Sequence, residues 1–156
     1  MSNVLTPTQQ VLKRWRMHRN ALIQLAAKLP ESGASWRPWS GGMSTLELLH
    51  HIAWTPDFFF AAIEGRDDLN IPPVPATIEE ARQLLDELTK EHEAKISAYT
   101  DSDLQKEVTI KAFNITEPVV EVLHRLIGHE AHHKGQLITY ARMLEIEPPF
   151  YVDLSV

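Results

Sequence analysis

The chain contains no cysteine, and this absence excludes a disulfide framework, a thiolate metal site and a cysteine nucleophile. It also has no apolar run approaching the ~20 residues that a membrane-spanning helix needs. Its first residues carry neither the basic cluster nor the apolar stretch of a signal peptide. We therefore expect a cytoplasmic protein with no membrane partner.

An excess of positive charge is absent too. The chain has 15 Lys and Arg against 21 Asp and Glu, which gives a formal net charge of −6. This balance argues against nucleic acid or an anionic lipid as the main partner. The partner that we expect is a small-molecule substrate. With 156 residues, 44% of them hydrophobic, the chain suits one domain over residues 1–156.

Four segments combine helix-capping residues with apolar positions at helical spacing. The expected helices span residues 6–29, 44–64, 77–99 and 116–144. In the first of these, Arg19 and the neighbouring basic residues are expected on the outer faces. Residues 101–115 hint at extended chain and a short hairpin, but no convincing sheet is present. The pattern predicts an all-α four-helix bundle.

Capping residues set the predicted helix boundaries. Ser44-Thr45-Leu46-Glu47 and Thr77-Ile78-Glu79-Glu80 are capping boxes, in which a hydroxyl and a carboxylate satisfy unpaired N–H groups. Thr116 is the expected cap of the last helix. Pro56 lies inside the second helix and should kink it or loosen one turn, and Gly65 should end it.

Histidine is unusually frequent, with eight copies, and it is the side chain most often used to bind transition metals. His129 and His133 are separated by one helical turn and about 40° around the axis, so both can reach one ion. They share a stripe with apolar residues at positions 122, 126 and 137 and with Tyr140, which predicts that they face the core.

The second helix carries the tandem pair His50-His51. His51 shares a face with apolar residues, whereas His50 shares one with Glu47 and Asp57, so His51 is the better inward candidate. We therefore predict one divalent metal ion on His51, His129 and His133, most simply zinc, with nickel or iron as alternatives. Three ligands leave coordination positions open, as catalytic sites do. The other histidines, at positions 18, 92, 124 and 132, are expected at the surface, at a boundary or on a polar flank.

Two other interpretations of these histidines need to be considered. Inward histidines can be hydrogen-bonded core residues without any metal, although burying several imidazoles requires a partner for each polar atom. Glu47-x-x-His50 and Glu130-x-x-His133 also match the spacing of two-metal carboxylate bundles. Such a site needs a carboxylate from every helix, and residues 6–29 contain no Asp or Glu. We therefore favour a single ion.

Two segments resemble the signatures of the DinB-like superfamily, also called DinB/YfiT. Residues 122–137, VLHRLIGHEAHHKGQL, resemble the signature of its fourth helix, and residues 44–52, STLELLHHI, that of its second. In the latter the ligand histidine follows a glutamate by four residues, which here is His51. Lys134 stands where the family usually has arginine. The similarity extends over essentially the whole chain in length and helix order.

This resemblance implies an up-down-down-up bundle, for which we expect a long crossover between the third and fourth helices. It also implies one metal ion, reported as zinc, nickel or iron in different members, and frequent homodimers. Relatives include thiol S-transferases, maleylpyruvate isomerases and presumed hydrolases. The apolar tail at residues 150–154 also favours a homodimer, because it needs a surface on which to pack.

The leading hypothesis is a mononuclear metal-dependent enzyme that acts as a hydrolase or a thiol S-transferase. The alternative is a bundle that binds a divalent metal or a small molecule without catalysis, since the sequence offers no clear general base. Glu130 lies beside the site but points about 100° away from His129. Gln136 and Tyr140 share the ligand stripe and could orient a ligand, and the segments 31–43 and 101–115 are expected to wall the pocket.

Overall fold

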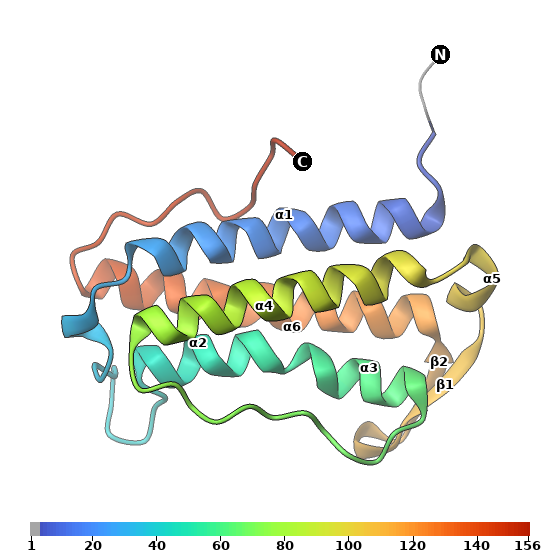
Figure 1. The fold of residues 1–156 in the computed structure, drawn as a ribbon, viewed down its shortest axis with the longest axis horizontal. Helices are drawn as coiled ribbons and strands as arrows, with labels where there is room; N and C mark the ends of the chain where they lie inside the picture. The colour runs from blue at the N-terminus through green and yellow to red at the C-terminus, as the bar shows by residue number, and fades with distance from the viewer. Residues whose placement is uncertain (1–3) are drawn as a thin grey trace.

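Pro7 opens the first helix, where Thr6 caps it by accepting a hydrogen bond from the Gln9 amide. In the computed structural model, which describes residues 4–156, four long rods of helix lie side by side (Figure 1). They are α1 (Pro7–Lys28), α2 (Thr45–Trp54) continued by α3 (Pro56–Glu64), α4 (Ile78–Ala98) and α6 (Val119–Met143). The predicted all-α four-helix bundle is confirmed.

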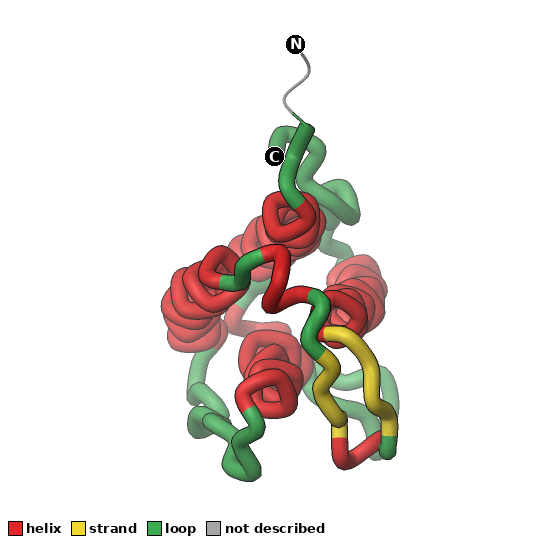
Figure 2. Tube along the Cα trace, turned by 90° about the vertical axis from the view of Figure 1, so that its right-hand side faces the viewer, coloured by secondary structure: helices red, strands yellow, loops and turns green. Residues whose placement is uncertain are grey.

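The shorter elements lie at the two ends of the bundle. They are the 3-10 turns η1 (Glu31–Gly33) and η2 (Lys111–Phe113), the single-turn helix α5 (Asp101–Leu104), and the strands β1 (Glu107–Ile110) and β2 (Ile115–Pro118). The strands pair antiparallel, with Ile110 opposite Ile115. The expected hairpin is therefore present, and Figure 2 shows it beside α6 and α3 at one end of the bundle.

Pro56 divides the second rod as expected. Thr55 keeps helical backbone angles between α2 and α3, so the two helices form one interrupted rod. Gly65 ends α3 in the left-handed conformation, at φ 68, which glycine adopts without steric cost. The Ser44–Glu47 capping box at the start of α2 also forms, with both reciprocal hydrogen bonds in place.

The helix directions follow the up-down-down-up order, because α3 and α4 run the same way (Figure 1). Two consecutive parallel helices need a connection that returns along the bundle. That crossover is the loop between Gly65 and Thr77, which Figure 1 shows running the length of the rod. Our placement of the crossover between the third and fourth helices was wrong, because residues 99–118 stay at one end and join antiparallel helices.

The start of the last helix also differs from the prediction. Thr116 does not cap it but lies in β2, where its hydroxyl bonds that of Thr109 across the hairpin at 2.8 Å. The helix begins at Val119, after Pro118, with no side-chain cap. The strand pairing takes residues 115–118 because their backbone groups find partners in β1.

The core consists of two apolar clusters along the bundle. One cluster contains Leu22, Leu25, Leu48, Leu49 and Leu137. The other gathers Trp15, Phe60, Ile96, Leu123 and Leu126. Between them, the fully buried Arg19 and Glu130 form a charged layer. The prediction that Arg19 lies on an outer face was therefore wrong.

In cross-section the rods occupy four corners, with α1 opposite the α2–α3 rod (Figure 2). The α2–α3 rod therefore has α4 on one side and α6 on the other, and it packs against both. The chain after α6 returns along α1, where the Asp153 amide donates to the Met17 carbonyl at 2.8 Å. Within residues 4–156, no helix has the length and apolar character needed to cross a bilayer.

Candidate metal centre

Three histidines from two helices converge at the contact between α2 and α6. The Nε2 atom of His51 lies 3.3 Å from that of His129 and 3.2 Å from that of His133. One ligand atom from each residue falls within 4.8 Å of the others. The structure therefore brings together the three histidines that the sequence analysis selected.

The local fold explains the convergence. His129 and His133 lie one turn apart on α6, and His51 faces them from the neighbouring α2. The His51 ring packs edge-on against Trp54, and the His129 ring lies 6.0 Å from that of Phe59. All three histidines are half-buried, so aromatic packing holds them while one side stays open to a ligand.

Hydrogen bonds to the far side of two rings determine where their protons sit. The Nδ1 atom of His133 lies 2.6 Å from the amide oxygen of Gln136, which can only accept, so Nδ1 carries the proton. The Thr55 hydroxyl donates to the His51 carbonyl and thus accepts from His51 Nδ1, 3.4 Å away. Both rings therefore turn an unprotonated Nε2 toward the centre.

Burial and mutual proximity keep the three rings neutral. Burial, and then the neighbouring His133 and His51, lowers the pKa of His129 to about 4. Burial likewise lowers the pKa of His51 and of His133 below the ordinary value of 6.5. A neutral imidazole is the form that binds a metal, so the site is ready to bind one at neutral pH.

The arrangement fits a metal ion better than it fits hydrogen bonding among the rings. With Nδ1 protonated, His51 and His133 face each other with two lone pairs and no proton between them, which is unfavourable without a cation. Three nitrogens bound about 2.0–2.1 Å from a tetrahedral ion lie about 3.3–3.4 Å apart. The observed 3.2 and 3.3 Å agree with that spacing.

The two histidines next to the cluster have other positions. His50 is buried, and its Nε2 donates to the Pro72 carbonyl at 2.8 Å, so it anchors the crossover loop. His132 is exposed, with its ring 4.8 Å from that of His133. The face argument correctly kept both out of the cluster, although it did not foresee that His50 is the more buried member of its pair.

The carboxylates considered for the site are engaged elsewhere. Glu130 is buried against Arg19, about 100° around α6 from His129. Glu47 closes the capping box with Ser44 and pairs with Arg37. Among residues 4–156, no Asp or Glu joins the histidine cluster. The geometry thus offers no support for the two-metal interpretation or for Glu130 as a base.

Two other residues of the ligand stripe have distinct roles. Gln136 contacts His133, as expected. Tyr140 instead donates its hydroxyl to the Met43 carbonyl at 3.0 Å and packs edge-on against Trp36. It therefore fixes the segment between α1 and α2 to α6, and that segment covers one end of the bundle.

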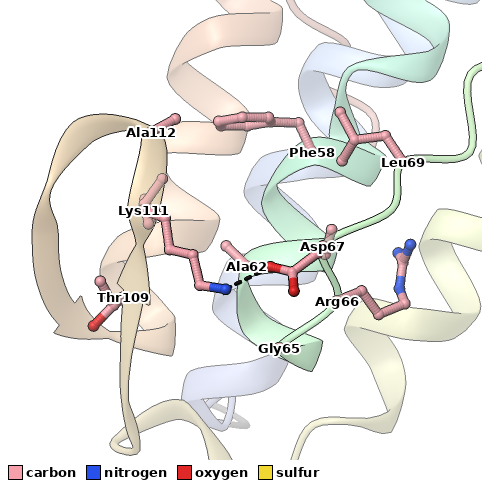
Figure 3. Close-up of a pocket in the computed structure, with 11 residues that line it drawn as sticks. Phe58, Ala62, Gly65, Arg66, Asp67, Leu69, Thr109, Lys111 and Ala112 are labelled. Carbon is pink, nitrogen blue, oxygen red and sulfur yellow. Dashed lines mark hydrogen bonds and ion pairs between the residues drawn. The ribbon is translucent and has the colours of Figure 1, made fainter.

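A cavity at the hairpin end of the bundle includes none of the three histidines. It holds about 190 Å³ between α3 and the hairpin, and we call it the hairpin pocket (Figure 3). Phe58, Leu69 and Ile110 are among its lining residues. The expectation that residues 101–115 wall a pocket therefore holds for this space rather than for a cavity over the histidines.

The sequence analysis missed two buried polar residues on or near the cluster's helices, His92 on α4 and Lys134 on α6. His92, expected at the surface or a boundary, is 1% exposed, and burial lowers its pKa to about 2. Lys134 is buried too, with a pKa lowered to about 8, and donates to His18 and to the Tyr151 carbonyl. Helical spacing could have found these residues, because His92 and Lys134 lie on apolar stripes of their helices.

Known proteins resemble the chain over most of its length. The family model described as DinB superfamily matches residues 14–137. The uncharacterized protein YjoA of Bacillus subtilis is 32% identical over 151 residues, which cover 92% of this chain and 96% of YjoA. The crystal structure of YjoA superimposes with a TM-score of 0.78 at 28% identity, covering 93% of this chain and 99% of YjoA.

More distant structures share the fold. A DinB-like protein from Bacillus cereus ATCC 10987 has a TM-score of 0.79 at 20% identity, covering 89% of this chain and 93% of that protein. YfiT from Bacillus subtilis has a TM-score of 0.68 at 15% identity, with 94% of each chain covered. YfiT is described as a probable metal-dependent hydrolase with an unusual four-helix bundle topology.

Proposed function

The chain belongs to the DinB superfamily, and from this premise we propose that it is a hydrolase that depends on one divalent metal ion, most simply zinc. His51, His129 and His133 hold this ion. The observation that carries the proposal is the convergence of three ring nitrogens. The Nε2 atom of His51 lies 3.3 Å from that of His129 and 3.2 Å from that of His133. In His51 and His133, the other ring nitrogen, Nδ1, is already hydrogen-bonded. The description of YfiT as a probable metal-dependent hydrolase supports the choice of reaction.

A divalent ion with open coordination positions supplies Lewis acidity and lowers the pKa of a water molecule. The protein's own contribution is to place its ligands and keep them neutral. Gln136 fixes the proton of His133 on Nδ1, and Thr55 does the same for His51. Such outer partners orient metal ligands and raise their basicity.

His132 is the exposed side chain best placed to assist a reaction at the rim of the site. It is exposed, and its ring packs edge-on against that of the ligand His133. An exposed imidazole in this position is the kind of side chain that general acid–base catalysis uses beside a bound substrate. Replacing it should lower turnover without removing the metal.

A non-catalytic binding bundle is the second candidate, and one observation favours it. Within the described chain, no carboxylate joins the three histidines, because Glu130 and Glu47 are paired elsewhere. A hydrolase usually positions such a group as a general base. Under this alternative, the protein binds metal stoichiometrically and catalyses nothing.

Metal analysis of protein purified without added metal tests the site. We expect about one ion per chain in the wild type and sharp losses in His51→Ala, His129→Ala and His133→Ala. His50→Ala and His132→Ala are the matched controls, because each removes an adjacent histidine that points elsewhere, and both should retain the ion. A wild type that binds none of several divalent ions would remove the basis of the proposal.

A substrate screen separates the two candidates. Metal-loaded and chelated protein are compared on ester, amide and thioester substrates, and on thiol–electrophile pairs to detect S-transfer. Metal-dependent hydrolysis that is lost in His132→Ala supports the hydrolase. Metal-dependent thiol transfer alone would replace hydrolysis with the transferase reaction, and full metal occupancy with no turnover in any assay would favour the binding bundle.

A further inference from the structure

The hairpin pocket exists because α3 presents small residues where the hairpin crosses it. Ala61, Ala62 and Gly65 line the pocket from the helix, and Ile110 and Ala112 line it from the hairpin. Ala61 and Ile110 are 2% and 1% exposed, so the inner wall is apolar and firmly packed. The Phe58 ring closes one end and lies 5.5 Å from that of Phe113 at the hairpin tip.

The size of the pocket limits what can enter. Its volume is about 190 Å³, and an engineered apolar cavity of about 150 Å³ binds benzene. One aromatic ring or a short aliphatic chain therefore fills it. Thr109 also lines the pocket, but its hydroxyl is already hydrogen-bonded to that of Thr116. A bound ligand would therefore contact mostly carbon atoms of the lining.

The mouth of the pocket is crossed by an ion pair between Lys111 of the hairpin and Asp67 of the crossover loop (Figure 3). Their side chains are 76% and 82% exposed. Exposed pairs of this kind contribute little free energy, because water solvates both charges when they separate. A carboxylate from a ligand can therefore replace that of Asp67 at Lys111 with little loss.

The other cation at the pocket is already neutralised. Arg66 donates to Asp57, to Glu64 and to the Asp68 carbonyl, and these partners hold its guanidinium to one side. Asp57 is itself buried and also accepts from the Asn70 amide. Lys111 is therefore the cation that a ligand can recruit.

We propose that the hairpin pocket binds a small carboxylic acid, with its aromatic or short aliphatic body between α3 and the hairpin and its carboxylate on Lys111. This site is separate from the histidine cluster, and its existence does not depend on the proposed metal chemistry. Phe58 of the pocket lining packs edge-on against Phe59, whose ring lies 6.0 Å from that of His129. These ring contacts connect the pocket lining to the histidine cluster, and the bound acid and the metal centre remain separate sites.

Benzoate is a suitable probe, and benzyl alcohol is its neutral match in size and shape. We expect a titration of benzoate into the full chain, followed by amide NMR shifts, to be saturable and to move resonances of Gly65, Thr109 and Ala112. Benzyl alcohol should bind at the same place but more weakly. Equal affinities for the two probes would overturn the role of the carboxylate, and shifts absent from the pocket would overturn the site.

Three substitutions test the recognition elements. Lys111→Ala should weaken benzoate by about two- to fivefold and leave benzyl alcohol unchanged, whereas Asp67→Asn should tighten benzoate because it removes the competing anion. Lys106→Ala is the matched control, because Lys106 is an exposed lysine beside the same hairpin, paired with Asp103 outside the pocket. Ala62→Leu should fill the cavity and abolish binding of both probes.

Benzoate could also bind a metal ion, so the titration is repeated on the chelated wild type and on His129→Ala. Shifts that persist around Gly65 and Ala112 in both samples, with the same dependence on Lys111, support the pocket. Binding that disappears when the metal is removed would assign the probe to the metal centre and reject this proposal. The proposed hydrolase function would survive that result.

Discussion

Arg19 and Glu130 form a two-bond ion pair inside the bundle, with Nε to Oε1 at 2.5 Å and Nη2 to Oε2 at 3.0 Å. Their side chains are 0% and 1% exposed. Arg19 comes from α1, and Glu130 lies on α6 between the ligands His129 and His133. The pair thus ties α1 to the helix that carries two of the three histidines.

Removing one member of this pair should be costly. Arg19→Ala leaves a buried carboxylate without a partner, and such losses cost about 3–5 kcal/mol. We expect a reduction of that size in the free energy of unfolding, measured by urea denaturation. The double variant Arg19→Met with Glu130→Leu should recover much of it, because an apolar pair leaves no charge uncompensated.

Arg16→Ala is the control for that experiment. Arg16 lies one turn before Arg19 and pairs with Glu93 at the surface, where both side chains are more than a third exposed. Its loss should cost less than about 1 kcal/mol. If Arg16→Ala and Arg19→Ala lower the free energy of unfolding equally, then burial of the Arg19–Glu130 pair does not increase its contribution to stability.

The positions of the helices were largely predictable, because caps and apolar spacing act locally. Ser44, Pro56 and Gly65 each behave as their chemistry requires. The crossover and the start of α6 were not predictable, because each depends on contacts between distant segments. Residues 115–118 entered a strand only because β1 lies beside them, and helical periodicity carries no information about that partner.

The histidine cluster was predictable for the same local reason, since the i, i+4 spacing places His129 and His133 together. The buried charges were missed for a different reason. Arg19 and Glu130 lie on apolar stripes of their helices, where a charge is stable only with a partner from another helix. The sequence shows each charge separately, and only the fold shows that they meet.

Gln136 should tune the metal centre through His133. Gln136→Leu removes the acceptor for Nδ1, and losses of such outer partners typically lower metal affinity about 10- to 100-fold. Gln136→Glu keeps an acceptor and should retain affinity. Competitive chelator titrations measure the metal affinity of each variant. Thr139→Ala, an exposed change one turn further along α6, is the control. If Thr139→Ala and Gln136→Leu lower metal affinity equally, Gln136 has no specific role at His133.

Removal of the ion should lower the melting temperature. A metal ion that binds only the folded state raises the free energy of unfolding by about 2.7 kcal/mol when the free metal concentration is 100 times the dissociation constant. For a domain of this size, that corresponds to a shift of about 5–10 °C. Differential scanning fluorimetry with and without chelator measures it, and His129→Ala should show no shift. If wild-type protein shown to have lost its metal melts unchanged, the site contributes nothing to stability.

We expect a homodimer that uses the chain after α6. Val152 is buried against the bundle, but Phe150, Tyr151 and Leu154 are 61%, 57% and 71% exposed. Light scattering should give twice the mass of one chain, and Phe150→Ser with Leu154→Ser should shift the protein toward monomer. Ile71→Ser makes the same kind of change, from a large apolar residue to serine, at the exposed crossover loop. It should leave the dimer intact. A wild type that stays monomeric at every concentration contradicts this expectation.

His92 should make stability depend on pH. Its Nδ1 lies 3.4 Å from Arg19 Nη1 and can only accept there, so the folded ring is neutral. Burial first, and then the charges of Arg19 and Lys95, lowers its pKa to about 2 from an ordinary value of 6.5. Because the unfolded chain takes up a proton that the folded chain refuses, stability is full above pH 6.5 and falls as pH decreases toward 2.

The expected loss from this one residue is about 2 kcal/mol between pH 7 and pH 5. His92→Gln keeps a side-chain acceptor for Arg19 but cannot titrate, so its unfolding free energy should fall less over that range. Urea denaturation is measured on metal-free protein, so that metal release does not contribute. The control is His124→Gln, at a side chain that is 40% exposed, and its stability should change with pH as that of the wild type does. If His92→Gln and the wild type lose the same stability between pH 7 and pH 5, then His92 accepts a proton in the folded state and the neutral-ring assignment is wrong.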